Sequence, residues 1–386
     1  MKYTTIGESC SVVSGGTPSR SKNEFWKDGT IPWIKIGNIK SKYVNAYDEL
    51  ITEQGLNNSS AKLLEKGTIL YTIFATLGEV GILDIEACTN QAIAGITIND
   101  SRITTDYLYY YLKSKKNYVN NIGRGVAQNN INLTTLKKFE IPLINVDKQL
   151  NIVNTLGKIE RIIVLKKKEI QYLDLLVRAR FVEMFGTLHD NKNGFEVVTI
   201  EDVCSLIKDG THQTPQYTED KEKGYKFLSS KDVMTQKIDW TDIKYIPAEL
   251  HKKLYATIKP QRNDILMSKN GVNYGVAAVN DTDEIFDIYV SLALLRPMEI
   301  IDPIFFRCVI NNQETKRQFD SSIKGIGVPN LHLGEIKKTR IFLPPMEHQK
   351  EFVAFVDQVD KSKLAIQKSL EKTQQLFDSL MQEYFG

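Results

Sequence analysis

The sequence predicts an α+β protein in which two globular domains are joined by two long antiparallel α-helices that form a coiled coil. Three observations support this fold class. The chain has 386 residues, which suits two domains with connecting elements. Its second half repeats its first half at a shift of 200 residues. Each half ends in a long amphipathic pattern, so we expect a pseudo-twofold internal repeat.

The internal repeat is clearest towards the end of each half. A shift of 200 residues, without a gap, places Gln149 on Gln349. The starts of the halves match at a shift of 194, which places Cys10 on Cys204, whereas the middles diverge. We expect the similar parts to meet a partner common to both halves, and the divergent middles to meet something that differs between them.

Two long helices are predicted because apolar residues recur at spacings of three and four. Helices of this length cannot bury an apolar stripe against one small domain, so we expect them to pack on each other. A globular domain lies between them in the sequence, which favours an antiparallel pair. The alternative is two separate helices that each lie on their own domain. The predicted division is 1–146 and 187–346 for the domains, and 147–186 and 347–386 for the helices.

Both globular parts have the pattern of mixed α and β structure. Gly and Asn separate short apolar runs, and few helices among many strands favour α+β with a sheet rich in antiparallel pairs. The tyrosine run at 107–111 is interpreted as helical core, with a base-stacking surface as the alternative. The predicted strands cover 31–36, 68–73, 80–83, 264–267 and 274–279, and the predicted domain helices cover 105–112 and 303–310.

Composition limits the class of protein. The net charge is only +3, so charge alone does not indicate nucleic-acid binding. The four cysteines lie far apart, which indicates buried thiols in a reducing cytoplasm rather than a zinc site. No apolar run approaches the roughly 18 residues of a membrane span, and the N-terminus lacks a signal-peptide core. We therefore expect a cytoplasmic protein without membrane contact.

Catalytic motifs are missing from the sequence. It contains neither an Asn-Pro-Pro-aromatic run nor a Gly-x-x-x-x-Gly-Lys-Ser/Thr phosphate loop. The Gly-x-Gly runs at 123–125 and 325–327 lack a third glycine, and the five histidines lack metal-ligand spacing. We therefore expect no catalytic residue, no metal and no cofactor.

Several local signatures occur in the same order in both halves. They are Gly-Gly-Thr-Pro at 15–18 with Gly-Thr-His-Gln-Thr-Pro at 210–215, the strand and turn at 34–39 and 227–233, the closing runs at 123–133 and 325–331, and the approach to each helix at 141–143 and 341–344. Together they resemble the specificity subunits of type I restriction–modification systems, over the whole chain. The departure at 210–215 leaves open which of its residues approach DNA.

The resemblance implies a non-catalytic subunit that binds double-stranded DNA. Each domain would be a target-recognition domain that reads one half of a bipartite site, and the helices would set the spacing. Two methyltransferase subunits would dock around the helices, and whether two restriction subunits join is left open. The alternatives are a coiled-coil scaffold that binds only proteins, and the recognition part of a fused nuclease–methyltransferase system.

Candidate base-reading residues are polar side chains on predicted turns, because such groups recognise base edges. The alternative for each is a solvated or turn-forming side chain. The candidates are Lys35, Asn38, Thr76, Arg124, Gln128 and Asn129 in the first domain, and Lys231, Lys269, Asn270, Asn273, Tyr274 and Lys324 in the second. The apolar helix stripe is expected to be core first and partner-binding surface second: Leu156, Ile159, Ile163, Leu173, Val356, Val359 and Leu370.

Overall fold

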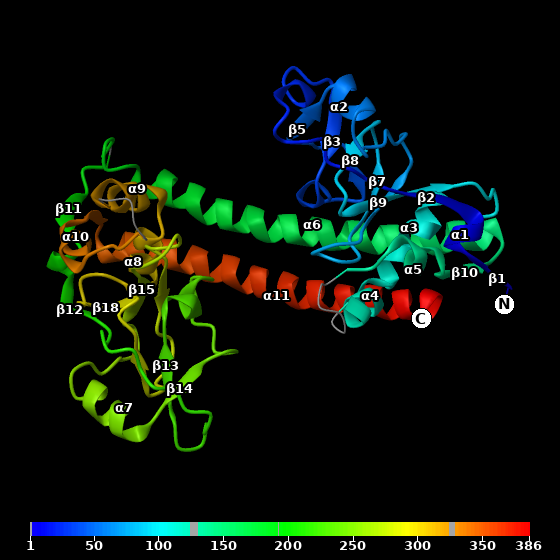
Figure 1. Ribbon diagram of the computed structural model, residues 1–386. Coiled ribbons are helices and arrows are strands. Elements are labelled where there is room, and N and C mark those ends of the chain that lie inside the picture. Colours follow the sequence, from blue (N-terminus) through cyan, green and yellow to red (C-terminus); the bar gives the residue numbers. More distant parts are fainter. Residues whose placement is uncertain (1, 124–129, 192, 324–328) are drawn as a thin grey trace. The chain divides into compact units, whose positions relative to one another are not determined.

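The computed structural model describes residues 2–123, 130–191, 193–323 and 329–386. The chain forms two compact units, and each contains one mixed α/β domain with parts of both long helices (Figure 1). The first unit is Met1–Lys167 with Lys368–Gly386, and the second is Lys168–Gln367. Within the described residues, no helix is apolar over a length that would cross a membrane.

The first unit contains a five-stranded sheet, a three-stranded sheet and a two-stranded pair. The five-stranded sheet has the order β2 (Cys10–Ser14), β9 (Ile93–Ile98), β6 (Ile69–Thr72), β7 (Val80–Leu83) and β4 (Tyr43–Val44). The smaller sheet has the order β5 (Glu49–Ile51), β3 (Ile31–Ile34) and β8 (Cys88–Thr89). Strand β1 (Lys2–Thr5) pairs with β10 (Glu140–Leu143), and the main helix of the domain is α3 (Thr105–Ser114).

The second unit repeats this plan. Its four-stranded sheet has the order β12 (Cys204–Asp209), β18 (Leu292–Pro297), β15 (Ile265–Ser268) and β16 (Ala277–Val279). Its smaller sheet has the order β14 (Lys244–Ile246), β13 (Tyr225–Leu228) and β17 (Phe286–Ile288). Strand β11 (Glu196–Thr199) pairs with β19 (Arg340–Leu343), and α8 (Pro303–Ile310) corresponds to α3.

The predicted strands and domain helices are present, with shorter strands than expected at 31–36, 68–73 and 274–279. Most strand pairs are antiparallel, but β3–β8, β4–β7 and β13–β17 are parallel. The tyrosine run is helical core as expected. Tyr107, Tyr110 and Tyr111 are each at most 1 % exposed, because α3 packs this face against the sheet and the long helices.

The two long helices are α6 (Val146–Phe185) and α11 (Met346–Phe385). Within the first unit, Lys166 Nζ donates to Ser369 Oγ at 2.8 Å. Within the second unit, α6 and α11 are joined by the ion pairs Lys363–Asp174 and Arg180–Glu351. In the second unit, positions that rise along α6 meet positions that fall along α11, so the predicted antiparallel pairing is confirmed there.

A buried glutamine fixes each long helix to its domain. Gln149 is 0 % exposed, and its Oε1 accepts a hydrogen bond from the Thr104 backbone N–H at 3.0 Å. Its Nε2 donates to the carbonyls of Arg102 and Ile144 at 2.6 and 3.0 Å. These bonds satisfy backbone groups at the start of α3 and the start of α6 together.

Gln349 repeats this arrangement in the second domain. Its Oε1 accepts from the Asp302 backbone N–H at 2.8 Å, and its Nε2 donates to the carbonyls of Ile300 and Pro344. The repeat in the sequence at these two positions therefore reflects the same joint between a domain and its following helix.

Replacing Gln149 with leucine is expected to lower the free energy of unfolding by about 2–4 kcal/mol, because three buried backbone groups lose their partners. Gln171→Leu on the exposed side of the same helix is the control. Hydrogen exchange of peptides that cover α3 measures the difference. Equal exchange rates in the two variants would contradict the role of Gln149.

Candidate nucleic-acid interface

Two loops of each domain emerge at the same edge of its main sheet. Strands β2 and β6 both pair antiparallel with β9, so their C-terminal ends lie at one edge. Ser14 and Thr72, which end these strands, pair with the adjacent residues Ala94 and Ile93. Strands β12 and β15 flank β18 in the same way. The topology therefore gathers the loops after these strands at one edge of the sheet in each domain.

A side-chain hydroxyl organises the loop after β6. Thr72 Oγ1 donates to the Thr76 carbonyl and accepts from the Glu79 backbone N–H at 2.8 Å. Ala75 adopts a left-handed conformation with φ of 60°, which turns the chain at the tip. Thr76 is consequently exposed at a tip whose base is fixed.

The loop after β15 is built on the same plan. Ser268 Oγ donates to the Asn273 carbonyl at 2.9 Å and accepts from the Val276 N–H at 3.0 Å. Gly271, with φ of 85°, stands where the first domain has Ala75. In both loops, one side-chain hydroxyl bonds two backbone groups and a left-handed residue turns the chain. The loops differ in the side chains at the tip.

A third segment, the turn after β3 or β13, is capped by a side chain in both domains. Asn38 Oδ1 accepts from the Lys35 backbone N–H at 2.9 Å, and Asp232 Oδ2 accepts from the Ser229 N–H at 2.7 Å. In the second domain, Ser291 joins this turn to the loop after β15. Its hydroxyl accepts from the Ser230 N–H at 3.0 Å.

Two of the expected base-reading residues are buried. Asn38 is 7 % exposed, and its amide is used inside the turn, where it also donates to Asp48 at 3.1 Å. Lys269 is 4 % exposed and forms an ion pair with Asp209. Their side chains serve the fold, so the expectation that they face a base edge needs this correction.

The polar side chains of Lys35 and Lys231 are at the surface but are held by carboxylates. Lys35 Nζ lies 2.8 Å from Glu49, and Lys231 Nζ lies 2.8 Å from Asp242. The hydrogen bond with Asp242 raises the pKa of Lys231 above its usual range. Both lysines therefore carry a charge that is partly neutralised within the domain.

The second-domain loop brings Asn270, Asn273 and Tyr274 together. Asn273 is exposed, and the Tyr274 hydroxyl donates to Asp320 at 2.5 Å, with Lys316 Nζ 3.1 Å from the ring centre. Burial and the Asp320 hydrogen bond raise the pKa of Tyr274 to about 12. Asn270 Oδ1 is buried without a hydrogen-bond partner among the described residues. The remaining expected readers lie outside the described residues: Arg124, Gln128, Asn129 and Lys324.

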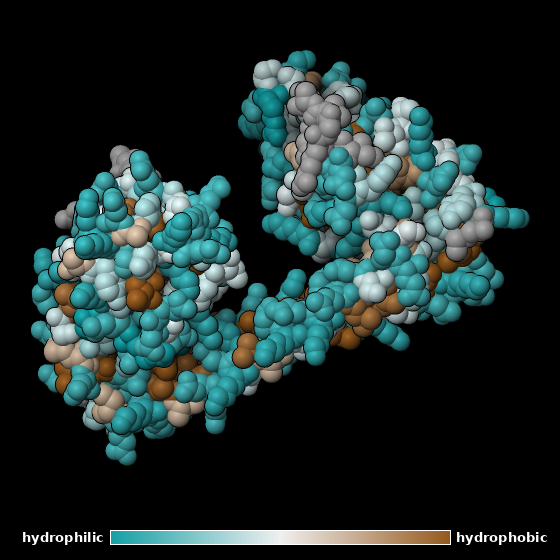
Figure 2. Space-filling view, turned by 90° about the horizontal axis from the view of Figure 1, so that it is seen from below, coloured by the Kyte–Doolittle hydropathy of each residue, from teal (hydrophilic) through white to brown (hydrophobic). Residues whose placement is uncertain are grey.

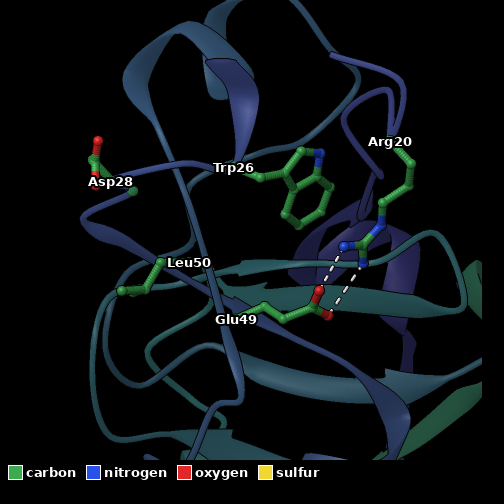
Figure 3. Close-up of a pocket in the computed structure, with 6 residues that line it drawn as sticks. Arg20, Trp26, Asp28, Glu49 and Leu50 are labelled. Carbon is green, nitrogen blue, oxygen red and sulfur yellow. Dashed lines mark hydrogen bonds and ion pairs between the residues drawn. The ribbon is translucent and has the colours of Figure 1, made fainter. Parts of the chain in front are cut away.

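An arginine that the sequence reasoning missed, Arg20, lies in the loop after β2 (Figure 3). Arg20 donates to both oxygens of Glu49, at 2.5 and 3.1 Å, and its guanidinium lies 3.6 Å from the ring centre of Trp26. The hydrogen bonds from Arg20 and then Lys35 lower the pKa of Glu49 to about 2. The only signal in the sequence was the Thr-Pro run just before it, which recurs in the second half.

Most of the residues expected to bind a partner face the protein interior. Leu156, Ile159 and Ile163 belong to the core of the first unit, and Val356 to that of the second. Val359 is 5 % exposed. Leu173 and Leu370 are half-buried, and Leu370 packs against the first core. Leu156, Ile159, Ile163, Val356 and Val359 are therefore core, as first expected of the stripe, whereas Leu173 and Leu370 stay candidates for a partner surface.

The buried Lys269–Asp209 pair gives a prediction, because the first domain has Ile73 and Ser14 at the matching sheet positions. Lys269→Ala is expected to destabilise the second domain by about 3 kcal/mol, since it leaves the carboxylate without its cation. The double variant Lys269→Ile with Asp209→Ser has the residues of the first domain at both positions. It is expected to lose much less stability than Lys269→Ala, since it leaves no buried charge. Hydrogen exchange across β15 measures both, and an equal loss in the two proteins would refute the explanation.

Comparison with known proteins finds the same family in both halves of the chain. A family model described as the type I restriction modification DNA specificity domain matches residues 1–175 and again 192–376. The chain is 26 % identical over 405 residues to the type I restriction enzyme MjaIX specificity subunit of Methanocaldococcus jannaschii, covering 98 % of this chain and 90 % of that protein. It is 28 % identical over 166 residues to the EcoR124I/EcoR124II specificity subunit of Escherichia coli, covering 42 % of this chain and 41 % of that one.

Two solved structures have the same fold. A chain from a study of complex assembly and conformational transition in the type I R-M system superposes with a TM-score of 0.60 at 18 % identity, covering 100 % of this chain and 97 % of that one. The type I restriction–modification S subunit from M. genitalium superposes with a TM-score of 0.51 at 16 % identity, covering 100 % and 96 %. With the family model matched in both halves, the chain belongs to the family of type I restriction–modification specificity subunits.

Proposed function

We propose that this chain selects the DNA site of a type I restriction–modification complex, with each domain reading one half of a bipartite sequence. One observation carries this proposal. The two domains share their strand order and their buried joints, while the loops at the same sheet edge carry different side chains. Two similar folds with different loop chemistry suit two different half-sites.

The charge distribution fits a protein that recognises DNA through a few local side chains rather than through its net charge. The net charge is +3, and Lys35 and Lys231 are paired with carboxylates. Such a surface gives little unspecific attraction to phosphates, so affinity would come largely from a basic partner. The exposed tips at Thr76 and Asn273, with Asn270 and Tyr274, are the proposed base contacts of this chain.

Partner subunits are proposed to dock on outward-facing apolar residues of the helices. Figure 2 shows apolar side chains exposed along these helices. The first unit exposes Val164 and Leu376 at 51 % and 52 %, and the second exposes Leu364 and Leu176 at 55 % and 47 %. These pairs are related by the 200-residue repeat. Two equivalent pairs of exposed apolar residues suit two copies of one methyltransferase subunit.

The function is tested by mapping methylated adenines. The chain is expressed with the methyltransferase subunit of its own system in a host that lacks adenine methylation. We expect a single split motif that depends on this chain and reports both half-sites, in a cytoplasmic complex. A soluble complex without new methylation would favour the protein-only scaffold instead.

The docking surface is tested with Leu364→Asp and Leu176→Asp combined. We expect binding of the methyltransferase subunit at the second unit to weaken at least tenfold, because apolar anchors dominate such interfaces. The loaded complex would then hold one methyltransferase subunit in place of two, as measured by native mass spectrometry. Lys361→Asp introduces the same charge at an exposed polar position and is the control. An unchanged stoichiometry would exclude this surface.

A further inference from the structure

The loop after β2 has a counterpart after β12, and no residue of either loop is among the candidate base-reading residues. The run Thr-Pro-Ser-Arg at 17–20 aligns with Thr-Pro-Gln-Tyr at 214–217. This alignment makes Arg20 and Tyr217 equivalent. Both loops begin at the sheet edge already described. The Gly15 backbone N–H donates to the carbonyl of the first residue of β9, and the Gly210 N–H donates to that of the first residue of β18.

The neighbouring strand supplies a second pair of equivalent positions. Glu49 lies opposite Trp33 in the pairing of β5 with β3. Lys244 lies opposite Phe227 in the pairing of β14 with β13. Glu49 and Lys244 are therefore the same position of the repeated sheet, although their charges are opposite.

The two positions touch each other in both domains. In the first domain, Arg20 donates twice to Glu49 and lies 5.0 Å from the ring centre of Trp33. In the second domain, Lys244 Nζ lies 4.3 Å from the ring centre of Tyr217. The contact between loop and strand is therefore repeated in the two domains. Its cation is Arg20 of the loop in the first domain and Lys244 of the strand in the second.

We propose that this paired position is a specificity-determining site in each domain, with Arg20 contacting a guanine of one half-site and Lys244 supplying the corresponding base contact in the other. The inference rests on the proposed function. Equivalent positions on one scaffold that exchange their chemistry are what distinct half-sites require, because the same fold must reach different base edges.

The geometry of Arg20 suits a base contact. Glu49 binds the two Nη atoms, which leaves Nε and the outer edge of the guanidinium without a hydrogen-bond partner among the described residues. That edge matches the two acceptors of guanine in the major groove. The side chain is 51 % exposed and lies at an open pocket of 350 Å³ lined by Trp26, Gly29 and Leu50 as well (Figure 3).

The surroundings of Arg20 also favour a base over a phosphate. Trp26 and Glu49 hold the guanidinium in one orientation, so less side-chain freedom is lost on binding. The adjacent carboxylate of Glu49 disfavours a phosphate at the same place through charge repulsion. A guanidinium that is held in one orientation and partly neutralised by a carboxylate discriminates between bases and adds little unspecific affinity for DNA.

The test uses the assembled methyltransferase complex and the adenine map. In Arg20→Ala, we expect discrimination at one base pair of one half-site to fall roughly tenfold to a hundredfold, with the other half-site unchanged. Arg20→Lys keeps the charge and loses the fork, so a similar loss is expected there. Arg102→Ala is the matched control, because Arg102 is an exposed arginine bound to Asp100 in the same domain.

Lys244→Ala is the second arm of the test and is expected to change only the other half-site. Its control is Lys337→Ala, which removes a half-buried surface lysine paired with Glu201. If the wild-type complex gives a split motif while Arg20→Ala and Arg20→Lys leave the base preference unchanged, that result would overturn this inference and leave the proposed function intact. A wild type without a split motif would instead overturn the proposed function.

Discussion

The cores of both domains depend on aromatic residues from the last turns of a long helix. Phe377, Met381 and Phe385 of α11 are at most 8 % exposed and lie in the core of the first unit. Phe181 and Phe185 of α6 occupy the same place in the second unit. Burying one such side chain contributes about 2 kcal/mol. Neither domain has a complete core without a helix end, so the helices are part of the domains as much as connections between them.

This constraint leaves the opposite edge of each sheet free to vary. The helix ends, the buried glutamines and the short strand pairs fix one side of the domain. The loops at the other edge are held at their bases by the hydroxyls of Thr72 and Ser268, and further out by a few contacts such as the bond from Tyr274 to Asp320. Exposed side chains at the tips, such as Thr76 and Asn273, can therefore change without a cost to the core, which suits two domains of one fold that recognise different DNA sequences.

The sequence predicted the parts of the fold that follow from periodicity and repetition. The bounds of α6 and α11 differ from the expected ones by only one residue at each end, because a 3.6-residue apolar period extends over their whole length. The candidate site was less predictable, since it depends on contacts between distant residues. Lys269 is buried by Asp209, and Arg20 is oriented by Glu49, 29 residues further along the chain. Neither partner can be inferred from local spacing. The two glutamines, in contrast, stand out in the sequence because they repeat at a shift of 200 residues.

The division of the chain into units affects the order in which it folds during synthesis. The second unit is continuous, from Lys168 to Gln367, whereas the first also needs Lys368–Gly386. A ribosome therefore releases every residue of the second core before the last residues of the first. The domain that is translated first is the one that finishes folding last, and until then its sheet and α3 must wait with an uncovered apolar face.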